Sequence, residues 1–479
     1  MVSQLNEAES WRAWKQIATE LDILTGAMDW RADDQCAALD APRLRRDIAA
    51  MADLRAQRSA DALTLLLRDS LQANIGDLTH ASLYSVALTG TKHIVDDYLD
   101  AVQTALTWLV ETPLVSLQRR RQLIAQADRI HGRPALLLSG GATLGFYHLG
   151  VVKALSERAL LPEVICGASM GAMIAAGVAT RTDEELATLW DDIDQIERFG
   201  LQRADLRQAW SQGALLDPQR MQETIRHNVG RWTFKQAHAR TGRVLNISIS
   251  PTRSGQSPRL LNHLTSPDAL ICQGALASGA IPGVFPPVTL RALQPDGQEV
   301  PYLPKEQWMD GSMHGDLPKM RLARLHNINR FIVSQTNPHV LPFMGLRERS
   351  GVLPTTTHVL AQAAWGHSRQ MLQVIARVAE PTPLHGWTDL AAHISQQEWR
   401  GDINIHPRFQ WQLFKRVFSN PTAADVRRFV QEGERATWPR VETIRQHTRL
   451  SRMLQTAQQA SQTPTAEGSE QRRLRAVGG

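Results

Sequence analysis

Residues 164–173 decide the fold, and they read Val164-Ile165-Cys166-Gly167-Ala168-Ser169-Met170-Gly171-Ala172-Met173. The stretch begins with a short apolar run typical of a strand and continues with small residues suited to a tightly packed helix. Between them, Gly167 to Gly171 fits the G-x-S-x-G pattern, in which a sharp turn presents a serine. Ser169 is therefore predicted at a helix N-terminus, where backbone N–H groups favour negative charge. Taken alone, the pattern is equally consistent with a simple connection between a strand and a helix.

A second strand–turn–helix unit precedes this one. An apolar run ending at Ser139 leads into the glycine-rich turn Gly140–Gly145, and residues 146–160 have a helical pattern. Glycines let backbone N–H groups approach a ligand oxygen, as an oxyanion hole requires. The turn departs from the nucleotide-binding pattern G-x-G-x-x-G at Ala142, and nothing in it resembles a Walker lysine. The two turns together predict one site, with N–H donors on the first and a nucleophile on the second.

A third candidate is the pair Asp310-Gly311, which ends a short apolar segment beginning at Trp308. Asp-Gly is a common β-turn pair, and a turn is the better interpretation of the pair by itself. Only together with the two glycine turns does the pair become a candidate for the same site.

The combination resembles the patatin-like phospholipases. Gly140–Gly145 is similar to the family's oxyanion loop, with Ala142 where glycine is more common. Gly167–Gly171 is similar to its nucleophile motif, and Asp310-Gly311 to its Asp-Gly motif. The resemblance narrows to the branch with an N-terminal lipase-associated domain (DUF3336), found in yeast and plant triacylglycerol lipases and bacterial relatives. Four further stretches carry it: Tyr84–His93, Phe146–Leu155, Ile281–Pro286 and Gly401–Ile405.

The resemblance implies a serine lipid acyl hydrolase with a Ser–Asp dyad, acting on triacylglycerol or phospholipid through an acyl-enzyme. Ser169 is then the nucleophile and Asp310 the general base, whereas His148 is a structural residue of its helix. A free aspartate has a pKa near ~4, and desolvation in an apolar cleft raises such a value. The expected oxyanion hole comprises Gly140, Gly141, Ala142 and Met170, and the motif glycines are Gly145, Gly167, Gly171 and Gly311.

Three alternatives remain open at this point. A Ser–His–Asp triad would need a histidine such as His314 or His358. A lysophospholipid acyltransferase would use the same site with a lipid acceptor in place of water. A catalytically silent lipid-binding scaffold would keep the motifs without assembling them.

The expected fold class is α/β, implied by the resemblance to be a patatin-like three-layer α/β/α core with a mostly parallel sheet and helical N- and C-terminal regions. Strands are predicted at 135–139, 163–166, 244–250 and 330–335, and their alternation with helices favours parallel pairing. The apolar segment Ile281–Val288 borders the acyl pocket or forms a buried loop. The predicted divisions are a helical N-terminal domain (1–132), the α/β catalytic domain (133–345), a helical extension (346–455) and a disordered tail (456–479).

Composition limits the function classes. The net charge of +6 is mild and diffuse, so it gives no support for nucleic-acid binding while permitting contact with anionic lipid. An odd count of three cysteines favours a reducing compartment. No signal-peptide pattern and no apolar run of membrane-spanning length is present, so we expect a cytoplasmic protein whose membrane contact is peripheral. No metal-binding motif or cofactor is indicated, and the oligomeric state is left open.

One helix predicted in the N-terminal domain could serve either a membrane surface or a protein core. Its apolar residues recur at helical spacing from Ile94 to Leu109. Its polar face carries Asp96, Asp97 and Asp100, which is the wrong charge for anionic lipid. We therefore predict that this helix faces the protein core.

Overall fold

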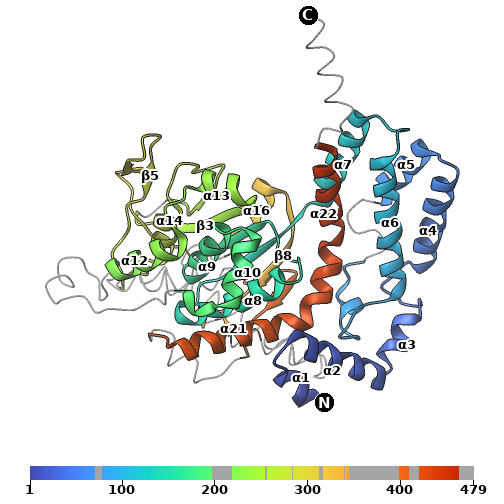
Figure 1. Ribbon diagram of the computed structural model, residues 1–479, viewed down its shortest axis with the longest axis horizontal. Coiled ribbons are helices and arrows are strands. Elements are labelled where there is room, and N and C mark those ends of the chain that lie inside the picture. Colours follow the sequence, from blue (N-terminus) through green and yellow to red (C-terminus); the bar gives the residue numbers. More distant parts are fainter. Residues whose placement is uncertain are drawn as a thin grey trace, which may run out of the picture. The chain divides into compact units, whose positions relative to one another are not determined.

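The computed structural model describes residues 1–70, 78–196, 218–253, 256–282, 284–311, 317–338, 340–341, 344, 399–408 and 420–462. The chain divides into two compact units, which Figure 1 shows as a group of helices and a sheet with helices around it. The helical unit comprises residues 1–134, 326–330 and 439–479, and the sheet unit comprises 135–325 and 331–438. Among the described helices, none combines the length and apolar composition that a membrane crossing requires.

The helical unit is built around α6 (His93–Glu111). The apolar residues of α6 that were predicted to face the core are all buried, which confirms that prediction. Its other described helices are α1 (Val2–Glu7), α2 (Trp11–Leu24), α3 (Ala27–Ala32), α4 (Ala41–Ala56), α5 (Ala60–Ser70), η2 (Ala81–Tyr84), α7 (Leu117–His131) and α22 (Val441–Gln462).

A buried polar cluster accounts for the unusual stretch Tyr84–His93 at the start of α6. The carboxylate of Asp22 in α2 is buried and accepts the backbone N–H of Leu88 at 2.9 Å. The fully buried Lys92 donates from Nζ to the carbonyl of Trp30 in α3 at 2.6 Å and lies 4.2 Å from the centre of the Trp30 ring. Buried charges require such partners, so the stretch attaches α2 and α3 to the start of α6.

The sheet unit contains a mixed sheet whose strand order is β4-β3-β2-β1-β8-β9, with β7 also paired to β3. The pairs β1/β2, β2/β3 and β8/β9 are parallel, while β4 and β7 run antiparallel to β3. All four predicted strands are confirmed, and the short strands β4, β7 and β9 were not predicted. The strands are β1 (Arg133–Leu138), β2 (Val164–Gly167), β3 (Val244–Pro251), β4 (Arg259–Leu261), β7 (Trp308–Asp310), β8 (Ile328–Ser334) and β9 (Ile403–Ile405), with β5 (Arg291–Leu293) and β6 (Glu299–Pro301) forming a separate hairpin.

Helices connect and cover these strands. They are η3 (Ala142–Phe146), α8 (Tyr147–Ser156), α9 (Met170–Ala179), α10 (Asp183–Asp191), η4 (Ile193–Gln195), α12 (Pro218–Val229), α13 (Phe234–Thr241), α14 (Ile271–Ser278), α16 (Lys319–His326), α21 (Ala423–Thr437) and η6 (Trp438–Arg440). Helix α21 packs directly on α8. The two helices lie so close together that a Cβ atom at Gly150 would be 1.9 Å from the Val430 carbonyl oxygen. Gly150 belongs to the Phe146–Leu155 stretch, so its lack of a side chain permits this close helix contact.

The region predicted as a helical extension is divided between the two units. Residues 345–398 lie outside the described residues, and Ile403–Ile405 forms β9 rather than helix. Helix α22 belongs to the helical unit and continues to Gln462, so the prediction of disorder from residue 456 is wrong for 456–462. Leu454 and Ala457 are buried in the core of that unit, and this burial stabilises the helix despite its polar composition. Residues 463–479 lie outside the described part.

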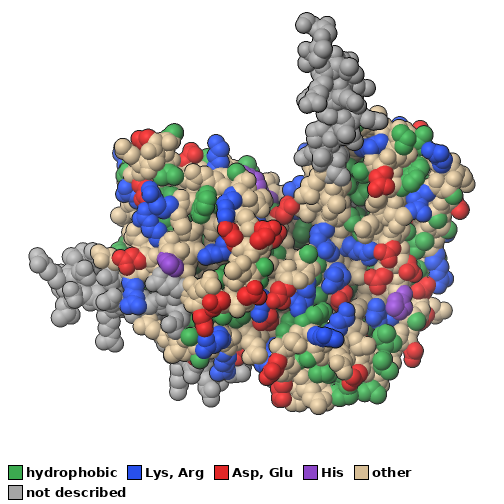
Figure 2. All heavy atoms as spheres, in the orientation of Figure 1, with side chains coloured by type: hydrophobic (Ala, Val, Ile, Leu, Met, Phe, Trp, Pro, Cys, Tyr) green, Lys and Arg blue, Asp and Glu red, His purple; other side chains and the backbone are tan. Residues whose placement is uncertain are grey.

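Surface charge is mixed. On the face shown in Figure 2, basic and acidic side chains are interspersed over both units. This distribution agrees with a net charge of only +6 on 479 residues.

Candidate active site

The G-x-S-x-G stretch forms a strained turn between β2 and α9. Strand β2 ends at Gly167 and α9 begins at Met170, which leaves Ser169 as the residue that caps the helix. Ser169 has φ 52° and ψ −126°, a conformation that is costly for any residue other than glycine. Backbone strain of this kind is typical of functional sites, and here it places Ser169 at the positive end of the helix dipole.

The two glycines of the motif are required by close backbone contacts. A Cβ atom at Gly167 would lie 2.3 Å from the carbonyl oxygen of Gly171, and one at Gly171 would lie 2.2 Å from that of Leu138. The Ala168 N–H also donates to the Leu138 carbonyl at 3.1 Å. The elbow is therefore packed against the end of β1, and larger residues would displace it.

A serine that the sequence did not indicate holds the elbow in place. The backbone N–H of Ser169 donates to Oγ of Ser278 at 2.9 Å, and the Ser278 hydroxyl donates to the carbonyl of Ser248 in β3 at 2.7 Å. All three residues are buried. Ser278 ends α14 in a run of small residues that matches no motif, so only the tertiary structure identifies it.

Asp310 lies on β7, which pairs with β3 next to Ser248. It ends β7 opposite Ile249 of β3, and its N–H donates to the carbonyl of Ala280 at 3.0 Å. Asp310 is only 2% exposed. A Cβ atom at Gly311 would lie 1.9 Å from the carbonyl oxygen of Ser248. The Asp-Gly pair and the support of the serine elbow therefore meet at the same peptide group of β3.

The glycine-rich turn leads from β1 into η3. Ala142 is the first residue of η3 and has φ 47°, a left-handed value that favours glycine. This conformation gives a physical reason why glycine would suit the position that Ala142 occupies. A Cβ atom at Gly145 would lie 2.3 Å from Cγ of Met170, so the turn packs against the start of α9. Ala142 and Met170 each begin a helix, and N–H groups in a first helical turn have no partner within that helix.

His148 supports the glycine-rich turn from within the protein. Its Nε2 donates to the Ser139 carbonyl at 3.0 Å, and its Nδ1 accepts the Ser334 hydroxyl at 2.7 Å. Complete burial lowers the pKa of His148 to about 4, which keeps the imidazole neutral. Because both ring nitrogens are engaged, the ring has no free nitrogen to act as a base toward Ser169, as the structural interpretation of this residue requires.

Thr336, which follows β8, is a second support that the sequence did not indicate. Its N–H donates to Oγ of Ser139 at 2.8 Å, and its hydroxyl donates to the carbonyl of Gly140 at 3.0 Å. A Cβ atom at Gly141 would lie 2.2 Å from Thr336 Oγ1. These contacts hold the carbonyl side of the turn, because hydrogen bonds to a carbonyl fix the orientation of its peptide group.

Other predicted site residues are only partly described. In the Ile281–Val288 segment, Phe285 is buried, whereas Ile281 and Val284 are half-buried. The segment follows Ala280, whose carbonyl binds the N–H of Asp310, and this position favours a border of the site over a fully buried loop. Gly283, His314 and His358 lie outside the described residues.

Comparisons with known proteins identify a family and several relatives. The chain matches the family described as patatin-like phospholipase over residues 136–321 and the domain of unknown function DUF3336 over residues 1–129. It is 30% identical to triacylglycerol lipase ptl2 of Schizosaccharomyces pombe (94% of this chain, 74% of that protein) and 29% identical to ptl3 of the same organism (95% and 96%). It is 32% identical to a patatin-like phospholipase domain-containing protein of Pyricularia oryzae, matching over 95% of its own length but spanning only 62% of that relative.

Proposed function

Because the chain belongs to the patatin-like phospholipase family, we propose that it hydrolyses fatty-acyl esters of glycerolipids, either triacylglycerol or phospholipid. Ser169 is the nucleophile and Asp310 the general base. The observation that carries this proposal is the strained, buried Ser169 elbow, held through Ser278 to the peptide group of Ser248 that Gly311 contacts. Relatives named triacylglycerol lipase in yeasts and in Arabidopsis thaliana support the substrate class.

In the first step, Asp310 accepts the proton of the Ser169 hydroxyl while Oγ forms a bond to the ester carbonyl carbon. Asp310 is almost fully buried at the end of β7. The carbonyl oxygen becomes an oxyanion, and the N–H groups of the Gly140–Ala142 turn and of Met170 stabilise it. The ester C–O bond then breaks, and Asp310 returns the proton to the departing alcohol oxygen.

In the second step, water attacks the acyl-enzyme. Asp310 accepts a proton from this water, the oxyanion forms again in the same hole, and the acyl–Oγ bond breaks. The proton then passes from Asp310 to Ser169 Oγ, which restores the enzyme and releases a fatty acid. The same two residues serve both steps, so the mechanism needs no histidine.

The substrate class places the reaction at a lipid surface. Long-chain glycerolipids are found in bilayers or droplets, so the protein acts there as a peripheral partner. A cytoplasmic location accords with the three free cysteines, of which Cys166 and Cys272 are buried.

The test compares wild type with Ser169→Ala on three substrates: a triacylglycerol emulsion, phosphatidylethanolamine vesicles and a lysophospholipid. We expect fatty-acid release by the wild type and none by the variant, and the ranking of the three substrates identifies the preferred ester. Covalent labelling of wild type, but not of Ser169→Ala, by a fluorophosphonate is a second readout. Equal, negligible release from both proteins together with no labelling would contradict the proposal.

A further inference from the structure

The helical unit contains a small polar cavity that the proposed reaction does not use. It lies where α5, α6, α7, α22 and the start of β8 meet, and all of these segments belong to that unit. The volume of the cavity is about 50 Å³. One water molecule needs about 10–15 Å³ of such space, so the cavity has room for about four oxygen-sized atoms.

Several polar atoms around this cavity are buried without a protein partner. Both ring nitrogens of His131 and both of His447 have no hydrogen-bond partner among the described residues. The same is true of Ser70 Oγ, Gln446 Oε1 and Arg330 Nε. Ser70 is only 4% exposed and Gln446 only 9%. Because buried polar groups are nearly always hydrogen-bonded, this cluster indicates a site for a small polar ligand.

The charge of the cavity indicates which class of ligand it suits. Arg330 carries the one permanent charge among the described residues that line it. Its terminal nitrogens donate to the Asn329 carbonyl and to Oγ1 of Thr79, each at 3.2 Å, and no carboxylate in the described part of the chain pairs with it. A buried charge requires a partner, and a guanidinium group binds anions and repels metal cations. The cavity therefore suits an anion.

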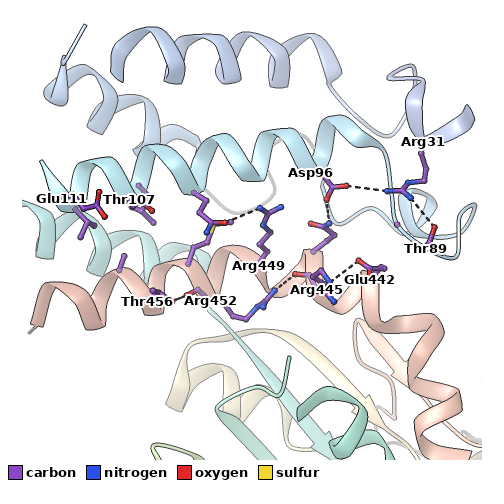
Figure 3. A pocket seen from close by; sticks show the side chains of 17 residues that line it. Arg31, Thr89, Asp96, Thr107, Glu111, Glu442, Arg445, Arg449, Arg452 and Thr456 are labelled. Atoms are coloured by element: carbon purple, nitrogen blue, oxygen red, sulfur yellow. Dashed lines mark hydrogen bonds and ion pairs between the residues drawn. The ribbon is translucent and has the colours of Figure 1, made fainter. Parts of the chain in front are cut away.

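Two carboxylates near this lining are already bound to other groups. Asp96 of α6 accepts a hydrogen bond from Nε2 of Gln446 and lies 4.0 Å from Arg31, as Figure 3 shows for the arginine. Asp128 of α7 forms an ion pair with Arg133 at 2.9 Å. Neither carboxylate lines the cavity. One uncompensated positive charge therefore remains at the cavity after these ion pairs are counted.

The two histidines couple this charge to protons. Burial and, to a smaller extent, the charge of Arg330 lower the pKa values of His131 and His447 to about 4, so both rings are neutral at pH 7. Burial raises the pKa values of Tyr84 and Tyr98, which also line the cavity, and their hydroxyls stay neutral as well. An anion beside the rings would oppose the effect of Arg330 and favour the protonated form of each histidine.

We propose that this cavity binds one tetrahedral oxyanion, phosphate or sulfate, between the guanidinium group of Arg330 and the rings of His131 and His447. The Ser70 hydroxyl, Arg330 Nε and one N–H from each neutral ring supply four donors for its four oxygens. The volume fits the free ion and leaves no room for a larger headgroup. The bound ion would link α7, α22 and β8, which are far apart in the sequence, and its binding would be accompanied by proton uptake.

The test measures sulfate binding to the full-length protein by calorimetry at pH 6 and pH 8, at constant ionic strength. Sulfate remains a dianion over this range, so any pH dependence comes from the protein. We expect one site per chain and an affinity at least tenfold higher at pH 6, because binding raises the pKa of at least one histidine. Titrations in two buffers of different ionisation enthalpy should show proton uptake at pH 6. Absence of binding, or equal affinity at the two pH values, would overturn the proposal.

Three variants test the assigned residues. Arg330→Gln removes the charge and should weaken sulfate binding by about tenfold or more. His447→Gln keeps a polar side chain and should halve the proton uptake. His93→Asn is the matched control, because His93 is exposed on α6 and does not line the cavity, and it should keep the affinity and the proton uptake of the wild type.

Two results would refute these assignments. One is wild-type affinity in Arg330→Gln, and the other is wild-type proton uptake in His447→Gln. The second measurement keeps its value if Arg330→Gln does not fold. None of these experiments requires turnover, so the cavity and the proposed hydrolysis are tested independently.

Discussion

Replacing Ser278 with Ala tests whether the positioning of the elbow depends on this hidden serine. The Ser278 hydroxyl accepts the Ser169 N–H at 2.9 Å and donates to Ser248 at 2.7 Å. Its removal leaves the buried N–H of Ser169 without its partner, which costs about 2 kcal/mol of folding free energy. It also frees an elbow whose φ of 52° is strained, and strain of about 1–3 kcal/mol can then relax.

Ser278→Ala should affect kcat more strongly than it affects the free energy of unfolding. A displacement of the nucleophile by about 1 Å can cost 10²-fold in rate, so we expect kcat to fall by about that factor with little change in KM. Hydrolysis of a short p-nitrophenyl ester gives kcat and KM, and urea unfolding gives the free energy. The short ester avoids effects of the lipid surface.

A matched control separates the two effects. Thr437 is fully buried in α21, and its hydroxyl donates to the Gly433 carbonyl at 2.8 Å. Thr437→Val should lower the free energy of unfolding by about 1 kcal/mol and leave kcat unchanged. If Ser278→Ala keeps wild-type kcat, or if both variants lose kcat equally, Ser278 does not position the nucleophile.

Three further predictions concern the same unit. Asp310→Asn should nearly abolish ester hydrolysis while leaving the circular dichroism spectrum unchanged, and retention of most of the activity would contradict the dyad. Ala142→Gly should raise the free energy of unfolding by up to about 1 kcal/mol, because φ 47° is costly for alanine; a lower melting temperature would show that this position is not strained. His148 has its pKa lowered from 6.5 to about 4, so its stabilising effect is complete above about pH 6.5 and is lost as the pH falls toward 4. Between pH 7 and pH 5 this histidine is protonated in the unfolded chain but not in the folded protein, which lowers the free energy of unfolding by about 2 kcal/mol. The pKa values of His131 and His447 are also lowered to about 4, so urea unfolding should show a loss in both proteins that is about 2 kcal/mol larger in wild type than in His148→Gln.

The sequence predicted the components of the site because their chemistry is local. The G-x-S-x-G pattern specifies a strand, a sharp turn and a helix in consecutive residues, and Ser169 was found in that conformation. The strands β1 and β2 were predicted because each contains a short apolar run, as a strand buried in a parallel sheet requires. The strands β3 and β8 also contain polar residues, but β-branched and aromatic residues still indicate a strand there. Ala142 was recognised as unusual from the resemblance to the family's oxyanion loop, and its positive φ gives a physical reason why glycine suits that position.

Short strands were missed because pairing, rather than composition, makes them strands. β7 and β9 contain three residues each and have no pattern of their own. Each is a strand only because β3 or β8 offers it backbone hydrogen bonds. The end of α22 was misassigned for a related reason, since Leu454 and Ala457 are buried against a core formed mainly by residues more than 300 positions earlier.

The sequence by itself thus determined which residues carry the proposed chemistry and the local turns that present them. Only the tertiary structure decided how those turns are held. Ser278 and Thr336 belong to no motif, yet their hydroxyl groups fix the elbow and the glycine-rich turn. A buried hydroxyl can satisfy any nearby N–H or carbonyl, so its role depends on which backbone groups the fold brings to it, and that information is not contained in its sequence neighbours.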